Sequence, residues 1–308
     1  MVRTRPWIHA ALLLATAVTT VVAGAGQAAL PDGAGVAAVA LAGLPYAAAI
    51  LGILAAHELG HWLMARAWGV DVTLPYFIPG PPFAGVGTLG AVIRIRSALP
   101  SRRAVLDVGA AGPIAGFAVA VPLLAVGLLR SEVRPVGDAL LEVGNAGSPA
   151  AMLRALLAGE EIGGAVSSVQ LMGDSLLTAA VQRLALGPLP PGHDVFLHPV
   201  AFAAWVGLLI TALNLLPVGQ LDGGHVLYAL LGRRRALALS SLAAWGLLAC
   251  GLFLSWSWLL WWVIARFIVR PAHPPALDEE PLDGGRVAVA LVSLAILALT
   301  FVPVPVSM

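Results

Sequence analysis

The residues most suited to chemistry form the pentapeptide His57-Glu-Leu-Gly-His61. Residues four apart lie on one face of a helix, so the side chains of His57 and His61 can point at the same metal ion. Glu58 follows the first histidine directly and can take a proton from a water molecule at that ion. Two metal ligands and a general base at this spacing indicate metal-assisted hydrolysis.

The setting of this pentapeptide strengthens that interpretation. It lies near the end of a long apolar run, Gly35 to Leu63. Ionisable side chains in a segment of membrane length are costly unless they are paired, bound to a ligand or facing a polar cavity. We therefore interpret His57, Glu58 and His61 as functional residues, with the two histidines binding a metal.

Composition identifies the class of protein. Of the 308 residues 59% are hydrophobic and only 11% are charged, and the mean hydropathy is +0.92. These values are typical of an integral membrane protein, whose partner is the lipid bilayer. The net charge of +1 offers no basic surface for nucleic acid, and the single Cys250 excludes an internal disulfide.

About seven segments are apolar and long enough to span a bilayer, each needing roughly 20 residues. The first could be a signal peptide, but its length and the spans that follow favour a retained helix. We expect an all-α polytopic membrane protein. The expected spans are about Ile8–Leu30, Gly35–Ala67, Val105–Leu129, Pro199–Leu216, Ala236–Leu254, Trp256–Val269 and Val287–Val304.

The arginines orient these spans. If seven spans alternate, thirteen of the 17 basic residues fall on one side, and the other side keeps four arginines with an excess of acids. The positive-inside rule then places the N-terminus in the cytoplasm and the C-terminus outside. We expect a multi-pass protein of a bacterial inner membrane whose active site lies toward the cytoplasm.

A catalytic zinc ion typically has three protein ligands, so one more is needed. The best candidate is Asp222, which follows the fourth span on its cytoplasmic side. The two histidines lie near the cytoplasmic end of the second span, so the arginine-based topology brings all three to one membrane depth. Pro217 and the glycines around Asp222 favour irregular backbone, which is tolerated at that depth only inside protein or beside water. The alternative is that Asp222 merely caps a helix.

Two stretches interrupt the spans. Residues 71–97 are broken by proline and glycine, and Gly87 to Arg96 alternates like a strand or hairpin. Such a strand edge could dock an extended peptide by backbone hydrogen bonds, or the stretch could be a surface loop without a substrate role. Residues 130–198 form the only sizeable extramembrane segment, with one amphipathic helix expected at Val169–Leu186.

The chain resembles the site-2 protease family of intramembrane zinc metalloproteases. The resemblance rests on His57-Glu-Leu-Gly-His61 together with Asn214-x-x-Pro217-x-x-x-x-Asp222-Gly223. Ala110-Ala-Gly-Pro-Ile-Ala-Gly116 and His198-Pro199 are also similar to elements of the family, the latter of its bacterial and chloroplast branch. No stretch reads as a PDZ or CBS domain.

The resemblance implies one zinc ion per chain, with His57, His61 and Asp222 as ligands and Glu58 as general base. It also implies that Asn214 lies near the reacting carbonyl, as an oxyanion donor. The implied substrate is the transmembrane segment of another protein, cleaved by regulated intramembrane proteolysis.

The expected organisation has three parts. Residues 1–34 contain the N-terminal transmembrane helix, residues 35–270 form the metalloprotease core with both interruptions, and residues 271–308 form a C-terminal loop and transmembrane helix. His225 could support a ligand from behind. Asp283 is expected to cap the last helix, and Asp107 either starts the third span or faces the bundle.

Other functions fit parts of the pattern. A metal-ion transporter could use the His and Asp cluster as a cation site, but the ionisable groups concentrate at one depth instead of forming a pathway. A different membrane zinc protease would take a glutamate as third ligand, against which the element around Asp222 argues. An inactive receptor would not need Glu58.

Overall fold

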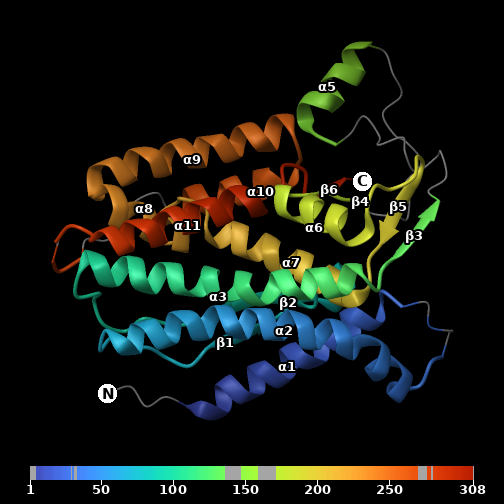
Figure 1. The fold of residues 1–308 in the computed structure, drawn as a ribbon, viewed down its shortest axis with the longest axis horizontal. Helices are drawn as coiled ribbons and strands as arrows, with labels where there is room; N and C mark the ends of the chain where they lie inside the picture. The colour runs from blue at the N-terminus through green and yellow to red at the C-terminus, as the bar shows by residue number, and fades with distance from the viewer. Residues whose placement is uncertain are drawn as a thin grey trace.

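The computed structural model describes residues 5–28, 30, 33–135, 147–158, 171–269, 276–278 and 280–307. Within these residues the chain is mostly helical, and its long helices lie side by side along the long axis of the molecule (Figure 1). The helices are α1 (Pro6–Ala25), α2 (Val36–Ala67), α3 (Arg102–Leu128), α5 (Pro149–Ala158), α6 (Leu176–Leu186), α7 (Pro199–Asn214), α8 (Asp222–Leu231), α9 (Arg233–Phe253), α10 (Ser257–Val263) and α11 (Gly284–Thr300). The last residues of the sixth predicted span form a π-helix, Ile264–Val269, directly after α10.

Four helices are long and apolar enough to cross a membrane. They are α1, α2, α3 and α9, with 20, 32, 27 and 21 residues, and a rise of about 1.5 Å per residue makes each about 30 Å long or longer. Three shorter apolar helices, α7, α10 with its π-helical extension, and α11, coincide with the other predicted spans. The predicted fold class, a helical polytopic membrane protein with a small β-hairpin, is confirmed.

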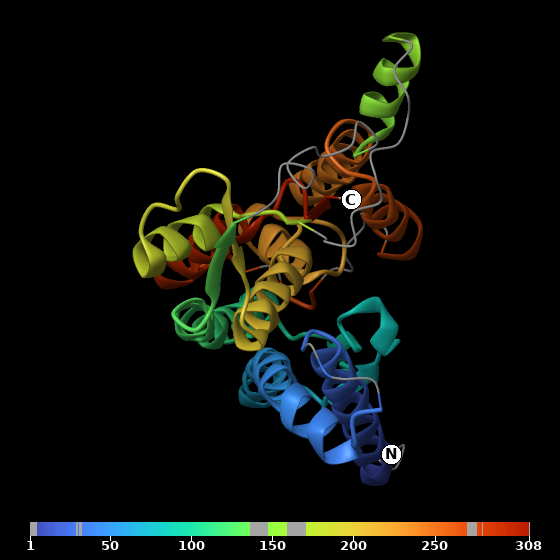
Figure 2. The ribbon, with the colours of Figure 1, turned by 90° about the vertical axis from the view of Figure 1, so that its right-hand side faces the viewer.

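Small residues allow the central helices to approach closely. A methyl group added at Gly60 of α2 would lie 2.5 Å from the Ala111 carbonyl oxygen of α3, and Gly207 of α7 packs against Ile53 of α2. Without a hydrophobic driving force between helices in lipid, such close packing is a main source of association. Figure 2 looks along the helices and shows α1 and α2 on one side, α3 and α7 in the middle, and α9 on the far side.

The fourth predicted crossing is broken. Helix α7 ends at Asn214, residues 215–221 form a tight irregular loop, and α8 begins at Asp222. The Ser240 hydroxyl of α9 donates to the Pro217 carbonyl at 2.8 Å and accepts from the Gly219 N–H at 3.3 Å. These bonds satisfy part of the loop's backbone, as irregular structure inside a membrane protein requires.

A β-hairpin fills the first interruption and lies against α1. Strand β1 (Tyr76–Pro79) pairs antiparallel with β2 (Thr88–Val92), with a short 3-10 helix, η1 (Pro82–Ala84), between them. At its base the Pro75 carbonyl contacts Nδ1 of His9 at 3.1 Å. At its tip the Gly87 and Val86 carbonyls accept from Thr19 at 2.6 Å and Tyr46 at 2.8 Å.

The hairpin therefore extends along α1 from residue 9 to residue 19, a distance of about 15 Å at helical rise. That part of α1 lies within an apolar helix of membrane-spanning length. The alternative of a loop confined to the membrane surface is wrong, because hydrogen bonds hold the tip against the middle of α1.

The segment before α7 carries short elements that the sequence pattern did not predict. Strand β3 (Glu132–Pro135) pairs with β5 (His193–Phe196), and β4 (Leu171–Met172) pairs with β6 (Val306–Ser307). The helix expected at Val169–Leu186 is wrong in its first half. It begins at Leu176 because Ser175 and Thr178 form a capping box, and Leu171–Met172 are extended; Val169 and Gln170 lie outside the described residues.

Candidate metal centre

Helix α2 carries the pentapeptide in its last third. His57, Glu58 and His61 are 3%, 4% and 7% exposed, so all three polar side chains are buried among neighbouring helices. Nε2 of His57 lies 3.1 Å from Nε2 of His61, which places the two ring nitrogens at one point, as expected for residues four apart on a helix.

The broken crossing brings Asp222 to the same point. Its Oδ2 atom lies 3.2 Å from Nε2 of His57 and 3.3 Å from Nε2 of His61. As the first residue of α8, Asp222 also places its carboxylate at a helix N-terminus, where negative charge is favoured. Among the residues that the structure describes, these three form the one group of His, Cys, Asp and Glu side chains arranged to hold a metal ion.

The geometry of this group fits zinc. Ligand atoms about 2.0–2.1 Å from a tetrahedral zinc ion lie roughly 3.3 Å from one another. The three donor atoms here are separated by 3.1, 3.2 and 3.3 Å. Two imidazoles and a carboxylate are also a ligand set typical of catalytic zinc sites, which keep one position open.

Helix α3 forms the wall behind the two histidines. Nδ1 of His61 lies 2.7 Å from the Val108 carbonyl oxygen, to which only a protonated ring nitrogen can donate. This hydrogen bond leaves Nε2 with its lone pair toward the centre, the arrangement that metal-binding histidines use. One turn further along α3, Gly112 lies against the His61 ring, and Gly116 lies against His57.

The two residues assigned to catalysis lie beside the three ligands. Glu58 is buried, and its carboxylate accepts a hydrogen bond from the backbone N–H of Ile93, just after β2. Nδ2 of Asn214, the last residue of α7, lies 3.3 Å from Nε2 of His57. The structure thus brings together His57, Glu58, His61, Asn214 and Asp222, the five site residues expected from the sequence.

The remaining polar residues have other places. His198 caps α7 through Nδ1, which accepts from the Val200 N–H at 3.2 Å, at the end of α7 opposite Asn214. Partial burial and the nearby Arg130 guanidinium lower the pKa of His198. His225 lies one turn after Asp222, with its Cβ close to Gly109 of α3. Asp283 caps α11 as expected, accepting from the Arg286 N–H at 3.0 Å.

Three features of the centre were not predicted from the sequence. They are the Val108 carbonyl bonded to His61, the Ile93 backbone bonded to Glu58, and the glycine cradle at Gly112 and Gly116. Only the cradle has a sequence signal, because its two glycines, four apart, share a helix face. Backbone partners leave no signature in the types of residue.

Comparison with known proteins gives a consistent result. Residues 45–257 match the model of the family described as Peptidase family M50. The chain is 33% identical over 266 residues to "Probable zinc metalloprotease EGY1, chloroplastic" of Arabidopsis thaliana, covering 85% of this chain and 43% of that protein. It is 30% identical over 265 residues to "Probable zinc metalloprotease EGY2, chloroplastic" of the same plant, covering 85% and 42%.

A rice relative extends the same pattern. The chain is 32% identical over 273 residues to "Probable zinc metalloprotease EGY3, chloroplastic" of Oryza sativa subsp. indica, covering 84% of this chain and 42% of that protein. The chain therefore spans about two fifths of the length of these relatives. No solved structure matches it.

Proposed function

The chain belongs to peptidase family M50, the site-2 protease family of zinc metalloproteases, and from this premise we propose that it is an intramembrane endopeptidase. It hydrolyses a peptide bond within the membrane-spanning segment of another protein. The observation that carries the proposal is the convergence of His57, His61 and Asp222 beside a buried Glu58, on helices of apolar, membrane-spanning character.

One zinc ion per chain is held by Nε2 of His57, Nε2 of His61 and Oδ2 of Asp222. When bound there, zinc supplies Lewis acidity that polarises a carbonyl group and lowers the pKa of water. The burial of the three ligands keeps bulk water from the centre, which strengthens every electrostatic interaction inside it.

Glu58 moves the proton. Its carboxylate takes a proton from the attacking water and delivers it to the leaving nitrogen of the peptide bond. The Ile93 N–H holds this carboxylate in place from the hairpin side. Asn214 directs its amide N–H group at the centre and donates to the carbonyl oxygen as negative charge develops there.

The substrate is a membrane-spanning helix that unwinds locally, because the peptide bonds of an intact helix are shielded. Its unwound backbone must find hydrogen-bond partners inside the membrane. Strand β2 supports such pairing, since β1 occupies one of its edges and its C-terminal end leads directly to Ile93 beside Glu58. An extended substrate segment would add a strand along the other edge of β2.

The location is a bacterial inner membrane, with the N-terminus in the cytoplasm. The excess of arginines at the ends of the helices on that side supports this orientation. The centre then lies nearer the cytoplasmic face, because α2 continues for only six residues beyond His61.

Replacing the general base tests the proposal. In proteoliposomes with a model membrane-spanning substrate, we expect Glu58→Gln to abolish cleavage while the protein keeps its zinc. Glu132→Gln, at an exposed position in β3, is the matched control and should cleave normally. Full activity of Glu58→Gln would refute the mechanism. Zinc flux into the liposomes, lost in Asp222→Ala, would instead support a metal-ion transporter.

A further inference from the structure

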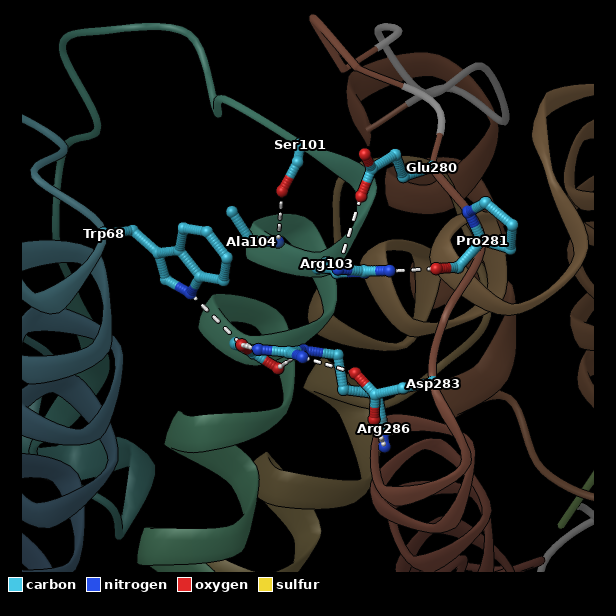
Figure 3. Close-up of polar contacts among 9 residues, drawn as sticks. Trp68, Ser101, Arg103, Ala104, Glu280, Pro281, Asp283 and Arg286 are labelled. Atoms are coloured by element: carbon cyan, nitrogen blue, oxygen red, sulfur yellow. Dashed lines mark hydrogen bonds and ion pairs between the residues drawn. The ribbon is translucent and has the colours of Figure 1, made fainter.

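A second polar cluster joins three helices near the metal centre. Asp107 of α3 accepts from Arg286 of α11 through Nε at 3.0 and 3.1 Å and through Nη2 at 2.7 Å. It also accepts from Nε1 of Trp68, the residue that ends α2, at 3.1 Å. Figure 3 shows Arg286 reaching from α11 toward Trp68, across the first turns of α3.

The cluster has the geometry of a strong interaction. The Asp107 and Arg286 side chains are only 15% and 28% exposed, and the guanidinium contacts both carboxylate oxygens. Bidentate pairing of this kind fixes orientation as well as distance. The guanidinium carbon also lies 5.7 Å from the centroid of the Trp68 ring, a cation–π contact.

Asp283 fixes Arg286 from the other side. Its carboxylate caps α11 through the Arg286 N–H at 3.0 Å and contacts Nη1 at 2.5 Å. These hydrogen bonds hold the pKa of Asp283 below its usual value. The guanidinium is therefore held between two carboxylates.

One covalent step connects the cluster to the metal centre. Asp107 directly precedes Val108, whose carbonyl oxygen accepts the hydrogen bond from Nδ1 of His61 at 2.7 Å. Trp68 lies seven residues after His61, which is two turns along the same helix. The cluster thus anchors both sides of the His61–Val108 bond: α3 through Asp107 and α2 through Trp68.

We propose that Arg286 is a positioning residue of the metal centre, which acts through Asp107 to hold the Val108 carbonyl under His61. The inference rests on the proposed function, because it assigns His61 as a zinc ligand. It also makes α11 part of the catalytic architecture, although Arg286 lies outside residues 45–257, which match the family.

A matched control is available on the same turn of α3. Arg103 contacts the Pro281 carbonyl at 3.1 Å and Glu280 at 3.3 Å, so it also links α3 to the segment before α11. These contacts are more exposed and do not involve Asp107. Arg103→Met removes a link between the same elements without touching the path to His61.

The experiment compares Arg286→Met, Asp107→Asn and Arg103→Met in detergent. Zinc affinity is measured by chelator competition, and the visible absorption of the cobalt-substituted protein reports the ligand geometry. Loss of a group that orients a metal ligand typically costs about 10–100-fold in affinity, and Arg286 acts one step further away. We expect about tenfold weaker zinc binding and a shifted cobalt band in the first two variants, and wild-type values in Arg103→Met.

Two further variants keep the test decisive. Combining Arg286→Met with Asp107→Asn should weaken binding no more than either change alone, since both break the same path. If Arg286→Met does not fold, Trp68→Phe removes one hydrogen bond to Asp107 and should weaken zinc binding two- to threefold.

The outcomes separate the two proposals. A lower melting temperature with wild-type zinc affinity and cobalt spectrum in Arg286→Met would make the cluster purely structural and overturn the inference. Unchanged zinc affinity in Trp68→Phe would do the same if that variant alone folds. A wild-type protein that binds zinc no better than His61→Ala would instead overturn the proposed function.

Discussion

Gly112 provides the sharpest test of the geometry of the metal centre. A methyl group at this position would lie 2.5 Å from Cε1 of His61, with two other ring atoms closer still, whereas ordinary contacts begin at 3.4 Å. The ring would have to move away by about 0.9 Å. It has little freedom to do so, because Nδ1 is bonded to the Val108 carbonyl one turn earlier on the same helix.

A shift of this size exceeds what zinc coordination tolerates. Metal–ligand distances are defined to about 0.2 Å, so Gly112→Ala removes His61 as an effective ligand. Disturbing a group that only supports a ligand already costs about 10–100-fold in affinity. We therefore expect at least a 100-fold loss of zinc affinity, or about 2.7 kcal/mol, and a matching loss of cleavage.

The controls separate this effect from helix propensity. Alanine is about 1 kcal/mol more favourable than glycine within a helix, so Gly112→Ala should not unfold α3 by itself. Gly52→Ala in α2 and Gly246→Ala in α9 introduce the same methyl group where nothing lies within 4 Å. Chelator competition and substrate cleavage should be normal in both. Zinc affinity of Gly112→Ala within threefold of wild type would refute the close packing of α3 on His61.

Three further perturbations test separate parts of the centre. Asn214→Ala should lower kcat about 10²–10³-fold with zinc retained, as for loss of an oxyanion donor; unchanged kcat would remove Asn214 from that role. Asp222→Ala should lose zinc by chelator competition, and retained stoichiometric zinc would contradict its assignment as a ligand. Gly87→Val places a side chain 2.8 Å from Cα of Thr20 at a positive φ of 72°, so it should displace the hairpin tip from α1. A KM raised more than kcat is lowered would support a substrate role for the hairpin, and unchanged kinetics would argue against it.

Much of the helical fold could be predicted because spanning a bilayer needs only length and apolar composition. The charge asymmetry between loops then ordered the spans without any knowledge of packing. This is why Asp222 could be assigned to the depth of His57 and His61 although more than 150 residues separate them. The depth argument needed no contact information, and the structure brings the three side chains within hydrogen-bond distance.

Contacts between distant segments could not be predicted. Strand β3 pairs with β5 about 60 residues later, and neither strand has an alternating pattern that specifies its partner. Asp107 and Arg286 are separated by 179 positions, and an aspartate near a helix start has an adequate local explanation. The start of α6 was also missed, since the apolar pattern continues upstream while Ser175 sets the true boundary.

The break between α7 and α8 affects how the protein is made. The polar loop and Asp222 enter the membrane only after α1, α2 and α3 have been synthesised, and Ser240, which satisfies the loop, follows later still. During translation the two histidines therefore wait, without their third ligand, for about 160 residues. The nascent chain cannot hold zinc in its final geometry until α9 has packed. Proteolytic activity is thus delayed until most of the bundle is assembled, which protects neighbouring membrane proteins from an incomplete enzyme.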